Sequence, residues 1–101
     1  MMEPGLDRHD WESELASLED DIRDYPQSAL PELDSLVGRM LEETGVDEND
    51  DARKEFAAAR EVMRLAEAGN EEISAGDVAA AVASYRAVFD YVITLGLPAE
   101  S

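Results

Sequence analysis

The chain has 101 residues with 25 acidic and 8 basic side chains, which give a formal net charge of −17; it holds one histidine and no cysteine. Such a polyanion is repelled by nucleic acid and by anionic lipid, and without cysteine it forms neither a disulfide nor a thiolate metal site. Residues 1–51 carry 17 of the acidic and 3 of the basic side chains, so the negative charge is concentrated in the first half.

The length predicts a single helical domain over residues 1–101, with flexible ends at residues 1–9 and 97–101. The N-terminal sequence lacks the basic and then apolar pattern of a signal peptide. The most apolar segment, residues 78–97, contains Arg86 and Asp90 near its centre, and two charges there are too costly for a bilayer span. We therefore expect a cytoplasmic protein, which the lack of cysteine also fits.

The first helix is predicted over residues 10–24, with Asp10 as its N-cap. It ends at the Tyr25-Pro26 pair, because the residue before a proline avoids the helical conformation. Its apolar residues recur at helical spacing and form one narrow stripe: Trp11, Leu15, Leu18 and Ile22. The other positions are polar or small, which predicts a surface helix held by a single apolar seam.

A second helix is predicted over residues 27–44, where Pro31 falls in the first turn and Gly45 provides the left-handed residue that commonly follows a helix. An acidic loop leads to a third helix over residues 51–68, which ends at Gly69 and Asn70. Both helices have an apolar face at helical spacing. These faces consist of Leu30, Leu33, Leu36, Val37, Met40 and Leu41 in the second helix and of Phe56, Ala59, Val62, Met63 and Ala66 in the third.

The fourth helix is predicted over residues 75–95 and begins with a capping box formed by Ser74 and Asp77. It is apolar almost all round, and such a helix is either central in its own bundle or buried in an oligomer. The four helices predict an all-α bundle. We also expect a homodimer seam along the fourth helix, in which Arg86 and Asp90 pair with each other or across the seam and set its register. The apolar residues predicted to fill the seam are Val78, Tyr85, Phe89 and Val92.

Three arginines form a basic stripe on the third helix: Arg53, Arg60 and Arg64. The stripe could bind an anionic ligand, but we expect it to pair with acidic residues of a neighbouring helix, here the first. Each exposed pair contributes only about 0–1 kcal/mol.

The loop at residues 47–51 has the alternating carboxylates of a calcium site. However, Ala52 stands where the turn requires glycine, and Ala58 stands where a bidentate glutamate should close the site. A solvated loop whose last acid, Asp51, caps the third helix is the better interpretation. The single histidine, His9, has no convergent partner for metal binding or acid–base work. No catalytic residue, metal or cofactor is therefore expected.

The remaining candidate is the acidic face of the first helix, continued by the loop at residues 47–51. Regularly spaced carboxylates on a rigid helix can imitate phosphates and engage a basic protein groove in a salt-sensitive way. A solvated surface is the alternative, and a high-salt habitat would favour the same composition. The residues assigned to this acidic surface are Glu12, Glu19, Asp20, Asp24, Asp47, Glu48, Asp50 and Asp51.

Residues spread along the chain carry a resemblance to one group of proteins: Trp11, Pro26, Ala29, Leu36, Val37, Met40, Gly45, and the segments at residues 56–60 and 84–89. On these positions the chain resembles small uncharacterised helical proteins of actinobacteria and other high-GC bacteria. Its loop at residues 45–51 is shorter than the corresponding loop of that group. The resemblance implies a helical bundle and nothing catalytic.

These observations predict a non-enzymatic, acidic protein–protein interaction module that associates with itself through the fourth helix and has a basic protein as its partner. The alternative is an acidic inhibitor or antitoxin-like protein whose carboxylate face mimics nucleic acid and blocks a basic groove. Direct binding to nucleic acid or to a membrane is not expected.

Overall fold

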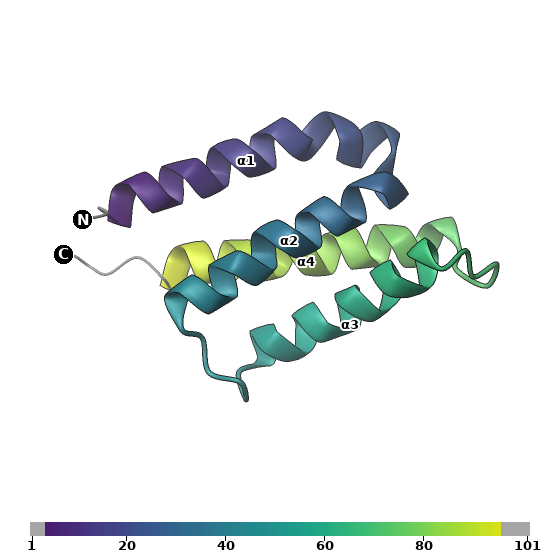
Figure 1. Ribbon diagram of the computed structural model, residues 1–101. Helices are drawn as coiled ribbons and strands as arrows, with labels where there is room; N and C mark the ends of the chain where they lie inside the picture. Colours follow the sequence, from purple (N-terminus) through teal and green to yellow (C-terminus); the bar gives the residue numbers. More distant parts are fainter. Residues whose placement is uncertain (1–3, 96–101) are drawn as a thin grey trace.

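The computed structural model describes residues 4–95 and contains four helices (Figure 1): α1 Pro4–Asp24, α2 Pro26–Thr44, α3 Asp51–Glu67 and α4 Ala75–Leu95. The predicted all-α bundle of four helices is confirmed. Residues 1–3 and the predicted flexible end at 97–101 lie outside the described residues. No helix in the described part of the chain combines the length and the apolar character that crossing a membrane requires.

The first helix begins six residues earlier than predicted, at Pro4. Proline suits the first turn of a helix because its fixed backbone angle is already helical and its missing N–H needs no partner there. Asp10 therefore lies inside α1 and is not its N-cap, and residues 4–9, which we had assigned to a flexible end, are helical. The other end is as predicted, since Tyr25 is the single non-helical residue between α1 and α2.

Local hydrogen bonds end and begin the other helices near the predicted positions. Gly45 has a φ of 70° in the left-handed region, and its N–H donates to the carbonyl of Leu41 at 3.1 Å. The capping box before α4 is confirmed, because Ser74 and Asp77 each accept the backbone N–H of the other, at 3.1 and 3.0 Å. The cap of α3 is one residue earlier than predicted: the Asp50 carboxylate accepts the Ala52 N–H at 2.9 Å.

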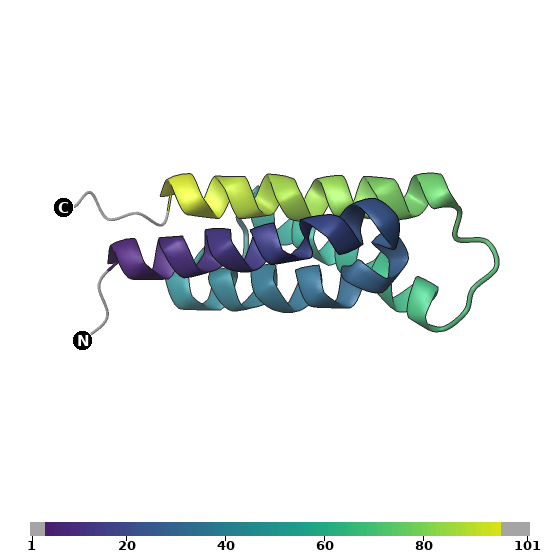
Figure 2. The ribbon, with the colours of Figure 1, turned by 90° about the horizontal axis from the view of Figure 1, so that it is seen from above.

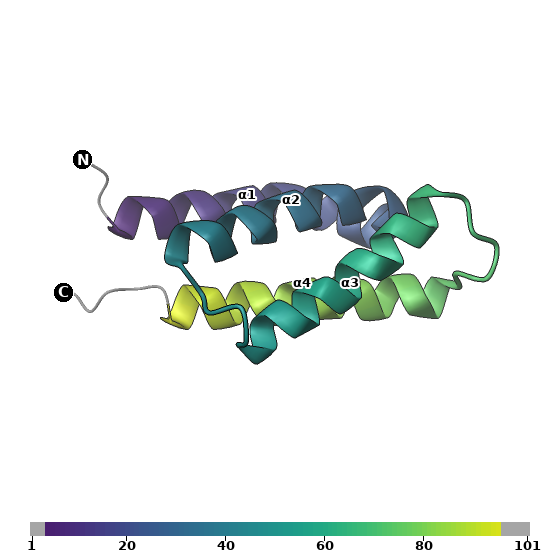
Figure 3. The ribbon, with the colours of Figure 1, turned by 60° about the horizontal axis from the view of Figure 1, so that its bottom comes forward.

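The second helix is the centre of the molecule, because it packs against each of the other three helices. Its large apolar side chains are almost completely buried. Figure 3 shows that α1 lies beside α2 and that α3 lies beside α4, and Figure 2 gives a view of the same bundle from above. As a result all four helices share one core, to which the described side chains of α1 add only Trp11, Leu18 and Ile22, and α1 packs mainly on α2.

The fourth helix turns its large side chains into the core of its own chain. The residues that we had assigned to a homodimer seam, Val78, Tyr85, Phe89 and Val92, are all buried there. The outward positions are mainly alanine, including Ala79, Ala80, Ala83 and Ala87. The four apolar residues predicted for the seam are therefore wrong. Large side chains that fill the core of one chain cannot also form a contact surface for a second chain.

Candidate functional site

The predicted acidic surface is divided between two separate places. The helix α1 lies along one edge of the bundle, and the loop at residues 45–50 lies on the opposite edge, with α2 between them (Figure 1). The reason is the path of the chain, because this loop leads to α3, which packs on α2 and α4 rather than on α1. The single continuous face that we predicted from the sequence is therefore wrong.

On α1, the carboxylates of Asp20 and Asp24 are exposed and share one cation. Arg23 contacts them at 3.1 and 3.3 Å. Glu19 is half-buried and pairs with Arg86 of α4, which corrects the predicted pairing of Arg86 with Asp90. Arg86 faces α1 across the bundle, whereas Asp90 one turn later points to solvent. Glu12, the fourth predicted residue of α1, is exposed as well.

In the loop, two of the four predicted acids have local structural roles. Asp47 accepts the backbone N–H of Asn49 at 2.7 Å, which closes a turn. Asp50 caps α3 and also accepts the Tyr91 hydroxyl proton at 2.8 Å. The backbone hydrogen bond, followed by the one from Tyr91, favours the carboxylate and lowers the pKa of Asp50. Glu48 and Asp51 are exposed.

The arginine stripe of α3 does not pair with α1. The guanidinium of Arg53 donates to the carbonyls of Leu41 and Val46 at 3.1 to 3.3 Å and so satisfies the C-terminal end of α2. Arg60 pairs with Asp34 of α2, and Arg64 is exposed. The predicted neighbour was therefore wrong, because α3 packs on α2 and not on α1.

Asp34 is the one buried charged residue among those described, at 6% exposure, and the sequence reasoning did not single it out. Its two carboxylate oxygens accept two hydrogen bonds from Arg60, at 2.8 and 2.9 Å, and one from the Tyr85 hydroxyl, at 2.7 Å. The Arg60 guanidinium lies 4.7 Å above the ring of Phe56, and this ring meets Tyr85 edge to face at 5.8 Å. A signal was present, since Asp34 is four residues after Leu30 on the apolar stripe of α2.

This cluster is built to hold three helices together. Burial first, and then the hydrogen bond to Asp34, raises the pKa of the Tyr85 hydroxyl far above its ordinary value. The hydrogen bond to Asp34 raises the pKa of Arg60 as well. Gly38, one turn after Asp34, leaves room for the aromatic ring, since a Cβ there would lie 3.3 Å from the end of Phe56. With its carboxylate held by three donors, Asp34 serves as a structural anchor.

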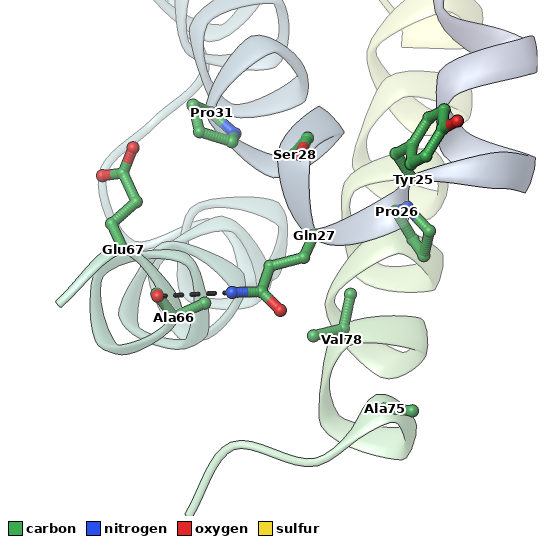
Figure 4. Close-up of a pocket in the computed structure, with 9 residues that line it drawn as sticks. All are labelled: Tyr25, Pro26, Gln27, Ser28, Pro31, Ala66, Glu67, Ala75 and Val78. Atoms are coloured by element: carbon green, nitrogen blue, oxygen red, sulfur yellow. Dashed lines mark hydrogen bonds between the residues drawn. The ribbon is translucent and has the colours of Figure 1, made fainter. Parts of the chain in front are cut away.

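A cleft of about 600 Å³ opens at the end of the bundle where the α1–α2 junction meets the end of α3 and the start of α4 (Figure 4). Gln27 reaches from α2 to α3 and donates to the carbonyl of Ala66 at 3.4 Å. Tyr25, at 66% exposure, lies at the edge of this cleft, and the sequence reasoning treated it only as a helix end. The lining residues are Tyr25, Pro26, Gln27, Ser28, Pro31, Ala66, Glu67, Ala75 and Val78.

The described side chains do not form a recognisable metal site, because no three carboxylate, imidazole or thiol groups converge among them. The side chain of His9, which we had weighed as an isolated histidine, lies outside the described side chains. Comparison of the chain with protein-family models, with curated proteins and with solved structures gives no match in any of the three. The resemblance to small actinobacterial proteins therefore stays a prediction.

Proposed function

We propose that this protein is a non-enzymatic interaction module that binds a basic protein partner. The observation that carries the proposal is a difference between basic and acidic side chains: most of the basic ones are engaged within the fold, whereas many of the acidic ones are exposed. Most basic side chains in the described part of the chain are already engaged: Arg23, Arg39, Arg60 and Arg86 form ion pairs, and Arg53 donates to backbone carbonyls.

The acidic side chains are far more numerous, and many of them are exposed. They lie on every helix and in both long loops, as Asp20, Glu32, Glu48, Glu61, Glu72 and Asp90 illustrate. The surface offered to another molecule is therefore anionic, which favours rapid and salt-sensitive association with a cationic protein surface. Nucleic acid and anionic lipid are disfavoured partners for the same reason.

The proposal is tested by capturing partners with the tagged protein from the lysate of its host, with washes at low and then at high salt. We expect a partner with a high isoelectric point that is retained at about 50 mM salt and released at about 500 mM salt, where screening shortens the range of these charges. If the low-salt wash retains no basic protein, or if the partner survives the high-salt wash, the proposal fails.

A second candidate function is an inhibitor that occupies a basic groove made for nucleic acid. The observation that favours it is the row of exposed carboxylates on helix α1, which includes Glu12, Asp20, Asp21 and Asp24. A variant with Glu12→Gln, Asp20→Asn and Asp24→Asn should lose the partner and keep its helical circular dichroism spectrum. Unchanged binding would remove this candidate without affecting the broader proposal.

Self-association through α4 is not part of this proposal, because its predicted residues fill the core. The oligomeric state itself stays a prediction from the sequence, and light scattering at micromolar concentration measures it directly.

A further inference from the structure

The cleft at the end of the bundle has the size and the lining of a site for side chains of another protein. Its volume of about 600 Å³ falls within the usual range for small binding sites, about 300–1,000 Å³. Most of the lining is apolar, since Pro26, Pro31, Ala66, Ala75 and Val78 all contribute to it. The polar groups are few, and one of them, Gln27, is already fixed by its hydrogen bond to α3.

The charge around the cleft has one dominant sign. Glu67 lines it, Asp24 directly precedes Tyr25, and the α3–α4 connection at the same end carries Glu71 and Glu72 (Figure 1). All four side chains are exposed. The helix dipoles do not set this sign, because the carboxyl ends of α1 and α3 and the amino ends of α2 and α4 meet at the same end of the bundle.

The cations near this end do not balance these acids. Arg23 is shared between Asp20 and Asp24, and Arg64 is an exposed side chain on the last turn of α3. The cleft is therefore an apolar pocket with an acidic surround.

We propose that this cleft binds a segment of a partner protein in which one large apolar side chain is flanked by lysine or arginine residues. The inference rests on the proposed function and names the place and the chemistry of the contact. The apolar side chain enters between Pro26, Ala75 and Val78, where it is removed from water. The flanking cations remain at the surface beside Glu67 and the neighbouring acids, where their charges are complementary.

Tyr25 gives this contact its specificity. It is a large aromatic side chain held at 66% exposure between two helices, and exposed tyrosines of this kind are frequent anchors in protein interfaces. Its backbone is fixed on both sides, because its N–H donates to Asp21 and its carbonyl accepts from Ala29. The ring is thus presented by a rigid junction, which limits the entropy lost on binding.

The inference is tested with fluorescein-labelled nonapeptides of alternating lysine and arginine that carry leucine, serine or tryptophan at the centre. Fluorescence anisotropy measures their affinity for the full chain. We expect the leucine and tryptophan peptides to bind at least about tenfold more tightly than the serine peptide, because the buried side chain leaves water. Equal binding of the three peptides would show contact by charge alone and would overturn the inference.

Two substitutions locate the site. Ala75→Trp fills the cleft from an exposed position, and Tyr25→Ser removes the aromatic anchor. The matched controls are Ala83→Trp, an exposed alanine of α4 about two turns beyond Ala75, and Tyr91→Ser near the opposite end of α4. We expect a loss of affinity of at least about tenfold for each cleft variant and less than about twofold for each control.

The outcomes separate this inference from the proposed function. If cleft and control variants bind the leucine peptide equally well, or if the wild-type chain does not bind it, the cleft is not the site and the inference fails. The salt-sensitive capture of a basic partner by the wild-type chain would still support the proposed function in that case. Circular dichroism spectra of all four variants must match the wild type, and an unfolded cleft variant is replaced by Ser28→Trp, which fills the same cleft.

Discussion

The helix α1 and the three-helix unit formed by α2, α3 and α4 are held in place by different forces. The three-helix unit combines a large apolar core with the buried carboxylate of Asp34, which joins α2 to α3 and α4. The helix α1 has one narrow apolar stripe on α2 and two half-exposed ion pairs, Glu14 with Arg39 and Glu19 with Arg86. The difference shows that α1 is the helix least integrated into the bundle, because only Trp11, Leu18 and Ile22 of its described side chains belong to the common core.

The largest expected effect compares two leucines, one in each region. Leu36→Ala in α2 should lower the free energy of unfolding by about 2–5 kcal/mol, because Leu36 is completely buried and its loss leaves a cavity. Leu15→Ala in α1 should cost only about 1 kcal/mol, since Leu15 is partly exposed. Urea unfolding followed by circular dichroism measures both, and similar losses would show that α1 is as deeply integrated as α2.

The next effect concerns the buried anchor of the three-helix unit. Asp34→Ala should lower the free energy of unfolding by about 2–3 kcal/mol, because it leaves the Tyr85 hydroxyl and the Arg60 guanidinium without their acceptor. The matched control is Glu32→Ala, an exposed acid on the same helix, which should change stability by no more than about 0.5 kcal/mol. If both variants unfold at the same urea concentration, the cluster is not an anchor.

A smaller effect appears at alkaline pH. The pKa of Tyr85 in the folded chain lies above its ordinary value of 10.0, so its contribution is complete below pH 10 and decreases as the pH rises further. We expect the wild type to lose about 1 kcal/mol more than Tyr85→Phe between pH 10 and pH 11. Tyr25→Phe is the control, because the Tyr25 side chain is exposed, at 66%. A Tyr85→Phe variant with the same alkaline slope as the wild type would contradict the prediction.

The smallest effect isolates the attachment of α1. Glu14→Gln with Glu19→Gln removes the two ion pairs that join described side chains of α1 to α2 and α4, and it should cost about 0–1 kcal/mol for each pair, because all four side chains are about half exposed. Hydrogen exchange should then become faster in the amides of α1 and remain unchanged in α2. The exposed Glu43→Gln is the control. Faster exchange in all four helices would show that α1 does not open independently.

The sequence by itself determined the four helices and most of their ends. Gly45, the Tyr25-Pro26 pair and the Ser74–Asp77 capping box act through hydrogen bonds within one turn of the chain, so each signal could be interpreted without knowing the fold. The start of α1 was missed because Pro4 begins a helix as readily as a polar cap does, and the polar first turns of α1 have no apolar periodicity to reveal them.

Only the tertiary structure decided which side chains meet. Asp34 lies 26 residues from Arg60 and 51 from Tyr85, and Glu19 lies 67 from Arg86. Helical periodicity shows which face of a helix is apolar, but it does not show which helix covers that face. The division of the acidic surface and the formation of the cleft have the same cause, because in both cases α1 and α3 pack on different sides of α2. That arrangement is fixed by side-chain packing between segments far apart in the sequence.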